Sequence, residues 1–255
     1  MDLKLSGKRA LVTGASQGMG KACAMELALL GCQVVIVARG EQKLSQTVAE
    51  LEKLSPQGHS YLVVDLSDRK SVEQIKGGFD ILVNNSGGPP GGLIAEAKEE
   101  DFEAAFHKHL FPYIAITQKC IPDMKKKKFG RIINIISSSV KQPIPFLGVS
   151  NTVRWSVAAW AKTLAGELGP FGITVNSVLP GSIHTDRLQQ NMEAEAARRH
   201  ISFEEVVAER IKTIPAGRIG EPREFGAVVA FLATPAASFV NGVALCVDGG
   251  QTTCL

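Results

Sequence analysis

Three glycines, Gly14, Gly18 and Gly20, lie close together near the start of the chain. Glycine adopts positive φ readily and lets a ligand come close to the backbone. The apolar run at 9–12 before them is typical of a strand, and the run at 21–30 after them is typical of a helix. The N-terminus of such a helix presents unpaired N–H groups and a partial positive charge. The pattern predicts a site for a diphosphate; a plain tight turn is the alternative interpretation of the glycines alone.

Arg39 follows a second predicted strand, at 33–38. An acidic residue at this place suits the ribose 2′-hydroxyl of NAD, whereas an arginine suits the 2′-phosphate of NADP. The guanidinium is a planar cationic fork that matches phosphate. We therefore expect NADP(H) to be preferred over NAD(H). A solvated arginine that begins the next helix is the alternative.

Strands and helices are predicted to alternate along the rest of the chain. Strands are expected at 59–64, 79–83, 131–136, 173–178 and 242–247. Helices are expected at 41–54, 67–76, 99–124, 151–168, 185–214 and 221–234, with a cap at Ser67 and a kink at Pro112. The alternation predicts an α/β fold, a Rossmann-like doubly wound parallel sheet in three layers, as a single domain over residues 1–255. Ligands of such sheets bind beyond the carboxyl ends of the strands.

Polar motifs follow several of these strands. They are T-G-x-x-x-G-x-G from Thr13 to Gly20, N-N-S-G from Asn84 to Gly87, and P-G-x-x-x-T from Pro180 to Thr185. Together they resemble the motifs of the short-chain dehydrogenase/reductase family, in which the second motif is N-N-A-G. The resemblance runs from about Gly7 to Gly250. It implies hydride transfer between a nicotinamide dinucleotide and a carbonyl or alcohol.

The resemblance also implies where the cofactor binds. It places Asp65 and the backbone of Leu66 at the adenine ring, although Asp65 is equally a candidate helix cap. It places the Ile183 backbone and the Thr185 hydroxyl at the nicotinamide carboxamide. Gln17 is uncharged where many NADP-binding relatives have a second basic residue. The expected cofactor-binding residues are Thr13, Gly14, Ser16, Gln17, Gly18, Met19, Gly20, Arg39, Asp65, Leu66, Asn85, Ser86, Gly87, Arg154, Pro180, Gly181, Ile183 and Thr185.

The catalytic stretch departs from the family pattern of Asn, Ser, Tyr and Lys. Ser137 fits the family's serine, but the residue thirteen positions later, where the tyrosine belongs, is Ser150. Arg154 stands four positions further on, where the lysine belongs, and His109 takes the place of the asparagine. The tyrosines, Tyr61 and Tyr113, are expected to lie away from this register.

These changes require different chemistry. A serine hydroxyl is a far weaker acid than a phenol with a pKa of about 10, and arginine does not release its proton. We expect Ser137 and Ser150 to hydrogen-bond the carbonyl and Arg154 to anchor the ribose. The proton would come from water or from His109, for which packing at a subunit interface is the alternative. A catalytically silent dinucleotide-binding sensor or partner subunit is the competing hypothesis for the whole chain.

The bulk properties narrow the class of protein. A net charge of +3 does not argue for nucleic acid, and five cysteines without a C-x-x-C pair indicate reduced thiols in a cytoplasmic protein. No metal spacing and no membrane span are expected. The helices at 99–124 and 151–168 are expected to pack subunits into a homodimer or homotetramer, as in family members.

The substrate is expected to be a small carbonyl compound or alcohol, 3-oxoacyl-like or another apolar ketone. Residues 185–215 are a probable lid over its pocket. The apolar residues expected to line that pocket are Leu93, Ile94, Ile144, Phe146 and Leu147.

Overall fold

A sheet of seven parallel strands forms the centre of the computed structural model, which describes residues 1–254. The strands lie in the order β3-β2-β1-β4-β5-β6-β7, so the order reverses between β1 and β4. Their bounds are β1 Arg9–Thr13, β2 Gln33–Ala38, β3 Ser60–Val63, β4 Ile81–Asn84, β5 Gly130–Ile135, β6 Ile173–Pro180 and β7 Ala244–Val247.

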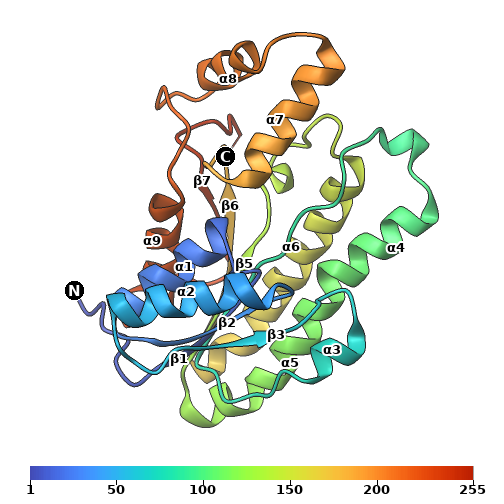
Figure 1. Cartoon of the computed structure of the whole chain (residues 1–255). Helices are drawn as coiled ribbons and strands as arrows, with labels where there is room; N and C mark the ends of the chain where they lie inside the picture. Colours follow the sequence, from blue (N-terminus) through green and yellow to red (C-terminus); the bar gives the residue numbers. More distant parts are fainter. Residues whose placement is uncertain (255) are drawn as a thin grey trace.

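Helices cover both faces of the sheet (Figure 1). Successive side chains of a strand point to opposite faces, and β1 shows the result. Ala10 and Val12 pack into one apolar cluster with residues of α1 (Gly18–Leu29), α2 (Glu41–Leu54) and α9 (Pro222–Ala233). Leu11, between them, packs into a second cluster with residues of α5 (Leu110–Lys127) and α6 (Gly148–Leu168). The predicted α/β fold, a Rossmann-like doubly wound sheet in three layers, is confirmed.

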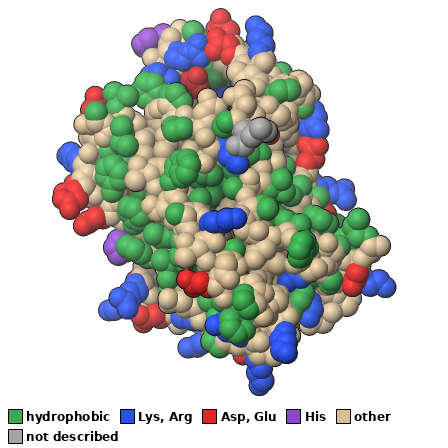
Figure 2. Space-filling model, turned by 180° about the vertical axis from the view of Figure 1, so that it is seen from behind, with side chains coloured by type: hydrophobic (Ala, Val, Ile, Leu, Met, Phe, Trp, Pro, Cys, Tyr) green, Lys and Arg blue, Asp and Glu red, His purple; other side chains and the backbone are tan. Residues whose placement is uncertain are grey.

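The helices are α1 Gly18–Leu29, α2 Glu41–Leu54, α3 Arg69–Glu73, α4 Glu99–Lys108, α5 Leu110–Lys127, α6 Gly148–Leu168, α7 Asp186–Arg199, α8 Phe203–Lys212 and α9 Pro222–Ala233. Short 3-10 turns lie at Ile94–Glu96, Ser138–Val140, Gly169–Phe171 and Pro235–Ala237. Seen from behind, hydrophobic side chains cover much of the surface, and charged side chains lie mainly toward its edges (Figure 2).

The single helix predicted at 99–124 is wrong, because two helices occupy this stretch. α4 ends at Lys108 and α5 begins at Leu110, with His109 between them at φ −119° and ψ −67°. Pro112 lies in the first turn of α5, where a missing N–H leaves no hydrogen bond unmade. The chain therefore breaks before Pro112 rather than kinking at it.

Two further helix predictions need correction. The cap at Ser67 is wrong: α3 begins later, and the Asp68 side chain caps it by accepting a hydrogen bond of 3.0 Å from the Lys70 N–H. The stretch predicted as one helix at 185–214 forms α7 and α8, separated by His200 in the left-handed conformation at φ 55°. These two helices pack against each other around Met192 and Val206, at the end of the molecule above the sheet (Figure 1).

Candidate active site

A cavity of about 1790 Å³ opens at the carboxyl ends of the strands, where the order of the sheet reverses. This is where ligands of doubly wound sheets bind. Most of the residues predicted from the sequence line it together: Gly14, Ser16, Gln17, Gly18, Met19, Arg39, Asp65, Leu66, Asn85, Ser86, Gly87, Ser137, Ser150, Arg154, Pro180, Gly181, Ile183 and Thr185. Thr13, Gly20 and His109 are not among its lining residues.

The glycine-rich turn has the geometry that its sequence requires. Gly14 and Gly18 have φ of +59° and +57°, a region that favours glycine. A Cβ on Gly20 would collide with the Gly14 carbonyl oxygen, so this glycine allows α1 to pack closely on the turn. The Gln17 side chain makes no cap hydrogen bond, so it leaves the first N–H groups of α1 without a side-chain partner beside the cavity.

Thr13 acts behind the turn rather than in the cavity. Its Oγ1 accepts a hydrogen bond from the Asn85 N–H at 2.8 Å and donates to the Asn85 carbonyl oxygen at 2.8 Å. The Asn85 amide in turn donates to the Gly14 carbonyl oxygen at 3.0 Å. These bonds tie the ends of β1 and β4 together and fix the turn against the neighbouring motif.

Two cations line the outer end of the cavity. Arg39 follows β2, and Lys43, which the sequence analysis did not single out, comes from the first turn of α2. Lys43 Nζ donates to Gln17 Oε1 at 2.6 Å, which places a basic group beside the uncharged Gln17. Asp65 accepts hydrogen bonds from the N–H and the hydroxyl of Ser67, and the side-chain bond above all lowers the pKa of this carboxyl.

A buried hydrogen-bond network lies behind the inner end of the cavity. Ser86 Oγ lies 2.6 Å from His109 Nδ1 and 2.9 Å from the Tyr113 hydroxyl. The Arg154 side chain lies close to the Tyr113 hydroxyl, and Arg154 Nη1 donates to the Ile135 carbonyl oxygen at 3.2 Å. Ser86 and Arg154 face the cavity, whereas Tyr113 and His109 are fully buried.

Tyr113 therefore lies beside the site in space, although it is far from the register of Ser150 and Arg154 in the sequence. The missed signal was its spacing, because Tyr113 stands four residues after His109 and such residues share a helix face. Burial raises the pKa of its phenol, and nearby Arg154 opposes that shift.

His109 is held neutral in this environment. Burial, with the charges of Arg154 and Lys108, lowers the pKa of the imidazole to about 2. Its Nε2 is buried and has no hydrogen-bond partner among residues 1–254. An imidazolium donor at neutral pH, one of the expected proton sources, does not agree with this placement.

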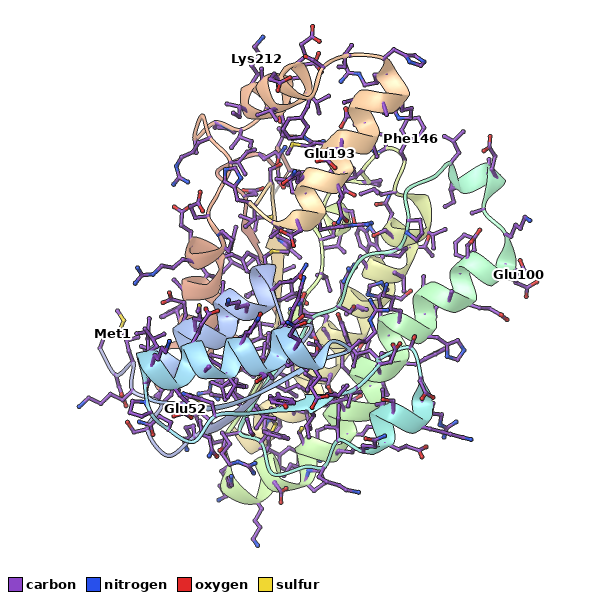
Figure 3. All side chains as sticks on the ribbon, viewed as in Figure 1. Met1, Glu52, Glu100, Phe146, Glu193 and Lys212 are labelled. Carbon is purple, nitrogen blue, oxygen red and sulfur yellow. The ribbon has the colours of Figure 1, made fainter. Side chains whose placement is uncertain are left out.

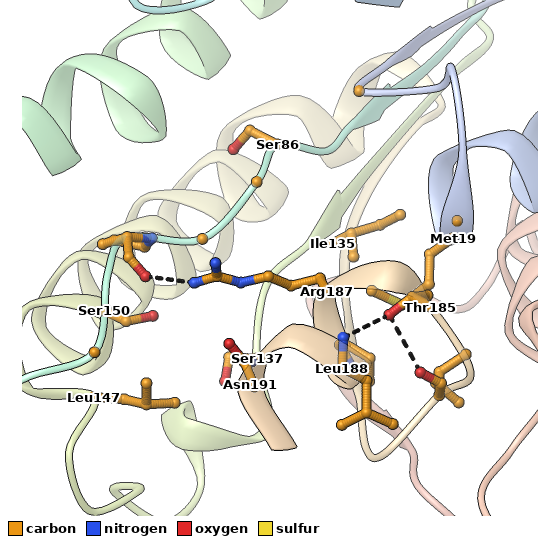
Figure 4. A pocket seen from close by; sticks show the side chains of 18 of the residues that line it. Met19, Ser86, Ile135, Ser137, Leu147, Ser150, Thr185, Arg187, Leu188 and Asn191 are labelled. Atoms are coloured by element: carbon orange, nitrogen blue, oxygen red, sulfur yellow. Dashed lines mark hydrogen bonds between the residues drawn. The ribbon is translucent and has the colours of Figure 1, made fainter. Parts of the chain in front are cut away.

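The two expected serines line the inner end of the cavity (Figure 4). Ser137 follows β5, and its Oγ accepts a hydrogen bond of 3.0 Å from the Ser139 N–H. Ser150 lies in the first turn of α6 and is 8% exposed. Thr185 caps α7 by accepting a bond from the Leu188 N–H at 3.2 Å. The hydroxyls of Ser137 and Ser150 are therefore positioned by the ends of two rigid elements.

The inner end is more cationic than the expected apolar pocket. Arg187, from the first turn of α7, reaches across the cavity and donates to the Pro89 carbonyl oxygen at 2.9 Å (Figure 4). Arg198 stacks over the Phe146 ring at 4.2 Å, where Phe146 lies beside α7 (Figure 3). Of the apolar residues expected here, Ile144, Phe146 and Leu147 line the cavity, whereas Leu93 and Ile94 are outside its lining.

Residues 1–254 contain neither a metal-binding cluster nor a membrane-spanning helix. No group of three or more His, Cys, Asp and Glu side chains in this range is arranged to hold a metal ion. No helix in this range combines the length and the apolar character needed to span a bilayer.

Comparison with known proteins gives consistent matches over nearly the whole chain. A family model described as enoyl-(acyl carrier protein) reductase matches residues 14–252. The chain is 35% identical over 259 residues to the 3-oxoacyl-acyl-carrier-protein reductase FabG of Vibrio cholerae, with 98% of this chain and 99% of that protein covered. It is 31% identical over 255 residues to the NADPH-dependent reductase BacG of Bacillus subtilis, with 97% and 98% covered.

A solved structure agrees with these relatives. The L-sorbose reductase of Gluconobacter frateurii, complexed with NADPH and L-sorbose, superposes with a TM-score of 0.93 at 27% identity, covering 100% of both chains. The strand-end motifs, the fold and these matches show that the chain belongs to the short-chain dehydrogenase/reductase family.

Proposed function

We propose that this protein is an NADP(H)-dependent oxidoreductase that transfers hydride between the nicotinamide and a carbonyl or alcohol carbon. The observation that carries the proposal is that residues of the three strand-end motifs line one cavity, with two serines and Arg154 at its inner end. Relatives that are NADPH-dependent or bind NADPH support the choice of cofactor.

The residues present fit a phosphorylated dinucleotide. The free N–H groups at the start of α1 suit its diphosphate, and Gly14 and Gly18, both at positive φ, shape the turn that presents them. Arg39 and Lys43 suit a 2′-phosphate. The Ile183 backbone and Thr185 would orient the carboxamide. When bound there, NADPH supplies the hydride.

Ser137 and Ser150 would polarise the substrate carbonyl. Because Ser137 Oγ accepts from the Ser139 N–H, its own hydrogen remains available to the substrate oxygen. Arg154 would hold the ribose, and its charge would favour the negative charge that develops on that oxygen. Removal of one such donor typically lowers kcat by about a hundredfold or more.

His109 would act as a positioning residue rather than as an acid. A buried N–H without a partner is rarer than a buried acceptor without one, so we place the imidazole hydrogen on Nδ1, where Ser86 Oγ accepts it. The positive charge of Arg154 close to the Tyr113 hydroxyl favours the phenol oxygen on its side, so the phenol hydrogen would point to Ser86 Oγ. Ser86 then directs its own hydrogen into the cavity. The proton would come from water, passed on by these hydroxyls.

A second candidate function is a dinucleotide-binding sensor or partner subunit without catalysis. The observation that favours it is that no tyrosine lines the cavity among residues 1–254, since Tyr113 is enclosed behind Ser86. Binding of NADPH without its oxidation across a broad panel of ketones and oxo acids would support this function over the first.

Loss of NADPH absorbance with that panel tests the proposal. We expect the parent to oxidise NADPH, and Ser137→Ala, Ser150→Ala and Arg154→Ala each to lower kcat/KM by about a hundredfold. Ser156→Ala is the matched control, because Ser156 is on the same helix as Ser150 and its hydroxyl bonds to the Thr152 carbonyl, outside the cavity. If all three variants turn over like the parent, the assignment is wrong.

We also propose that residues 185–215 act as a lid. α7 contributes Arg187, Leu188 and Asn191 to the cavity wall, and α7 and α8 share a small apolar cluster of their own. Such segments close over bound ligands in many enzymes. Amide hydrogen exchange of these residues should slow when NADP⁺ and a substrate analogue are added. Unchanged exchange in α7 and α8 would contradict a lid.

A further inference from the structure

Arg154 and Arg187 approach the same glycine at the inner end of the cavity, and Lys108 lies near the neighbouring one, where the charges of Arg39 and Asp65 also act on it. A Cβ on Gly88 would lie 3.9 Å from Arg154 Nη2 and 4.0 Å from Arg187 Nη2, and one on Gly87 would lie 3.9 Å from Lys108 Nζ. Within residues 1–254, Lys108, Arg154 and Arg187 form no salt bridge, although nine other ion pairs are present.

The hydrogen-bond donors of this cluster are only partly used. Arg154 is 6% exposed, and its buried Nε has no partner within the described chain. Arg187 donates to the Pro89 carbonyl oxygen, one bond of the five that a guanidinium can make. Burial, followed by the charges of Arg39 and Arg187, lowers the pKa of Lys108, and the Asp65 carboxylate opposes that shift in part. Like charges gathered in a partly dry site are costly unless an anion joins them.

The dinucleotide does not account for all of this charge. In the proposed site, its diphosphate binds at the start of α1, on the side of the cavity where Met19 lies. Its 2′-phosphate binds Arg39 and Lys43. Arg187 points away from Met19 and Thr185, toward the segment that carries Pro89 and toward Ser150 (Figure 4). The cation thus faces the place where the serines would hold the carbonyl.

We infer that the substrate carries a carboxylate beside its reacting carbon, so that it is an oxo acid or the corresponding hydroxy acid rather than a neutral ketone. Arg187 binds the carboxylate through two parallel N–H bonds of its planar guanidinium. The positive charges of Arg154 and Lys108 attract the same carboxylate from a greater distance. Ile144, Phe146 and Leu147 receive the apolar remainder. The inference rests on the proposed function, because it assigns the substrate of the same cavity.

The test is a binding titration that needs no turnover. The protein is saturated with NADP⁺, which has no hydride to give, and titrated with α-ketoisocaproate or with its methyl ester in a calorimeter. We expect the acid to bind about tenfold more tightly than the ester, since charge-assisted hydrogen bonds are the strong ones. Arg187→Met should abolish this preference and Arg187→Lys should keep part of it. Arg69→Met, which removes an exposed arginine on α3 outside the cavity, should leave it unchanged.

The outcomes separate this inference from the proposed function. Equal binding of acid and ester, no binding of either, or an unchanged preference in Arg187→Met overturns the inference while leaving hydride transfer standing. A tenfold weaker binding of NADP⁺ to Arg187→Met, with the acid preference kept, assigns this arginine to the diphosphate and also overturns it. If NADP⁺ itself does not bind, the proposed function fails, and the same titrations on the free protein still decide the inference.

Discussion

His109 is a buried imidazole beside two cations, and its protonation differs from that of a histidine in water. Burial and the charges of Arg154 and Lys108 lower its pKa to about 2. The group is therefore neutral near neutral pH, and we propose that its part in the site is to hold Ser86 in place.

The first prediction concerns stability against pH. The unfolded chain protonates His109 near pH 6.5, whereas the folded chain does so only near 2. The contribution of the neutral imidazole to the free energy of unfolding is therefore complete above pH 6.5. It is lost as the pH falls below that value, because the unfolded chain then binds a proton that the folded chain does not. Between about pH 7.5 and about pH 5.5, the loss from this group is roughly 1.4 kcal/mol. Urea unfolding of parent and His109→Asn at both pH values measures it. An equal pH dependence in the two proteins would contradict the burial of a neutral imidazole.

The second prediction concerns cofactor choice. Arg39→Ala should weaken binding of NADPH by about tenfold or more, because a charge-assisted contact to the 2′-phosphate is lost. Binding of NADH, which lacks that phosphate, should stay as in the parent. Parallel calorimetric titrations with the two dinucleotides measure both effects. Equal losses for NADPH and NADH would show that Arg39 does not read the phosphate.

At this scale, some site residues were predictable from the sequence and others were not. Ser137, Ser150 and Arg154 could be placed because their spacing follows a known register. Arg187 and Lys43 could not, because each lies in the first turn of a helix beyond the motif residues, and the sequence does not show which side chains of that turn point into the cavity. Tyr113 belongs to no family motif, and only its spacing of four residues from His109 points to the site.

The glycine-rich turn and α1 form the element on which the cofactor site depends. Gly20→Ala should disrupt it, because the new Cβ would collide with the Gly14 carbonyl oxygen. We expect roughly tenfold or greater loss of NADPH affinity, together with a destabilisation of about 1–3 kcal/mol from overpacking. Calorimetry and urea unfolding measure the two effects.

Gly166→Ala is the matched control for that substitution. Gly166 lies within α6, and a Cβ there meets nothing within 4 Å. The alanine should leave NADPH binding unchanged and raise stability by about 0.5–1 kcal/mol, since glycine is a poor helix former. If both variants bind NADPH like the parent, close packing of α1 on the turn is not required for the site.

The elements of the sheet were more predictable than the helix boundaries. Continuous apolar runs between turn residues located the strands, because both faces of a parallel sheet are buried. The break between α4 and α5 carries no glycine, and the nearest proline lies after it. The position of that break depends on the tertiary packing around His109, so local sequence patterns do not predict it.

At the scale of the whole molecule, assembly into a homodimer or homotetramer remains a prediction. Phe111 on α5 and Trp155 on α6 are 48% and 49% exposed, on the two helices expected to pack subunits together. Phe111→Ser should therefore reduce the molar mass measured by light scattering. Phe239→Ser changes a fully exposed phenylalanine outside these helices and should leave it unaltered. A monomeric parent, or equal masses for parent and Phe111→Ser, would contradict this interface.

The central claim is that one cavity holds a phosphorylated dinucleotide with its reactive ring against Ser137, Ser150 and Arg154. A crystal structure of the protein with NADP⁺ tests it most directly. The account predicts the 2′-phosphate at Arg39 and Lys43, the diphosphate at the start of α1, and nicotinamide C4 facing the two serine hydroxyls. A dinucleotide bound elsewhere, or a nicotinamide turned away from both serines, would contradict it.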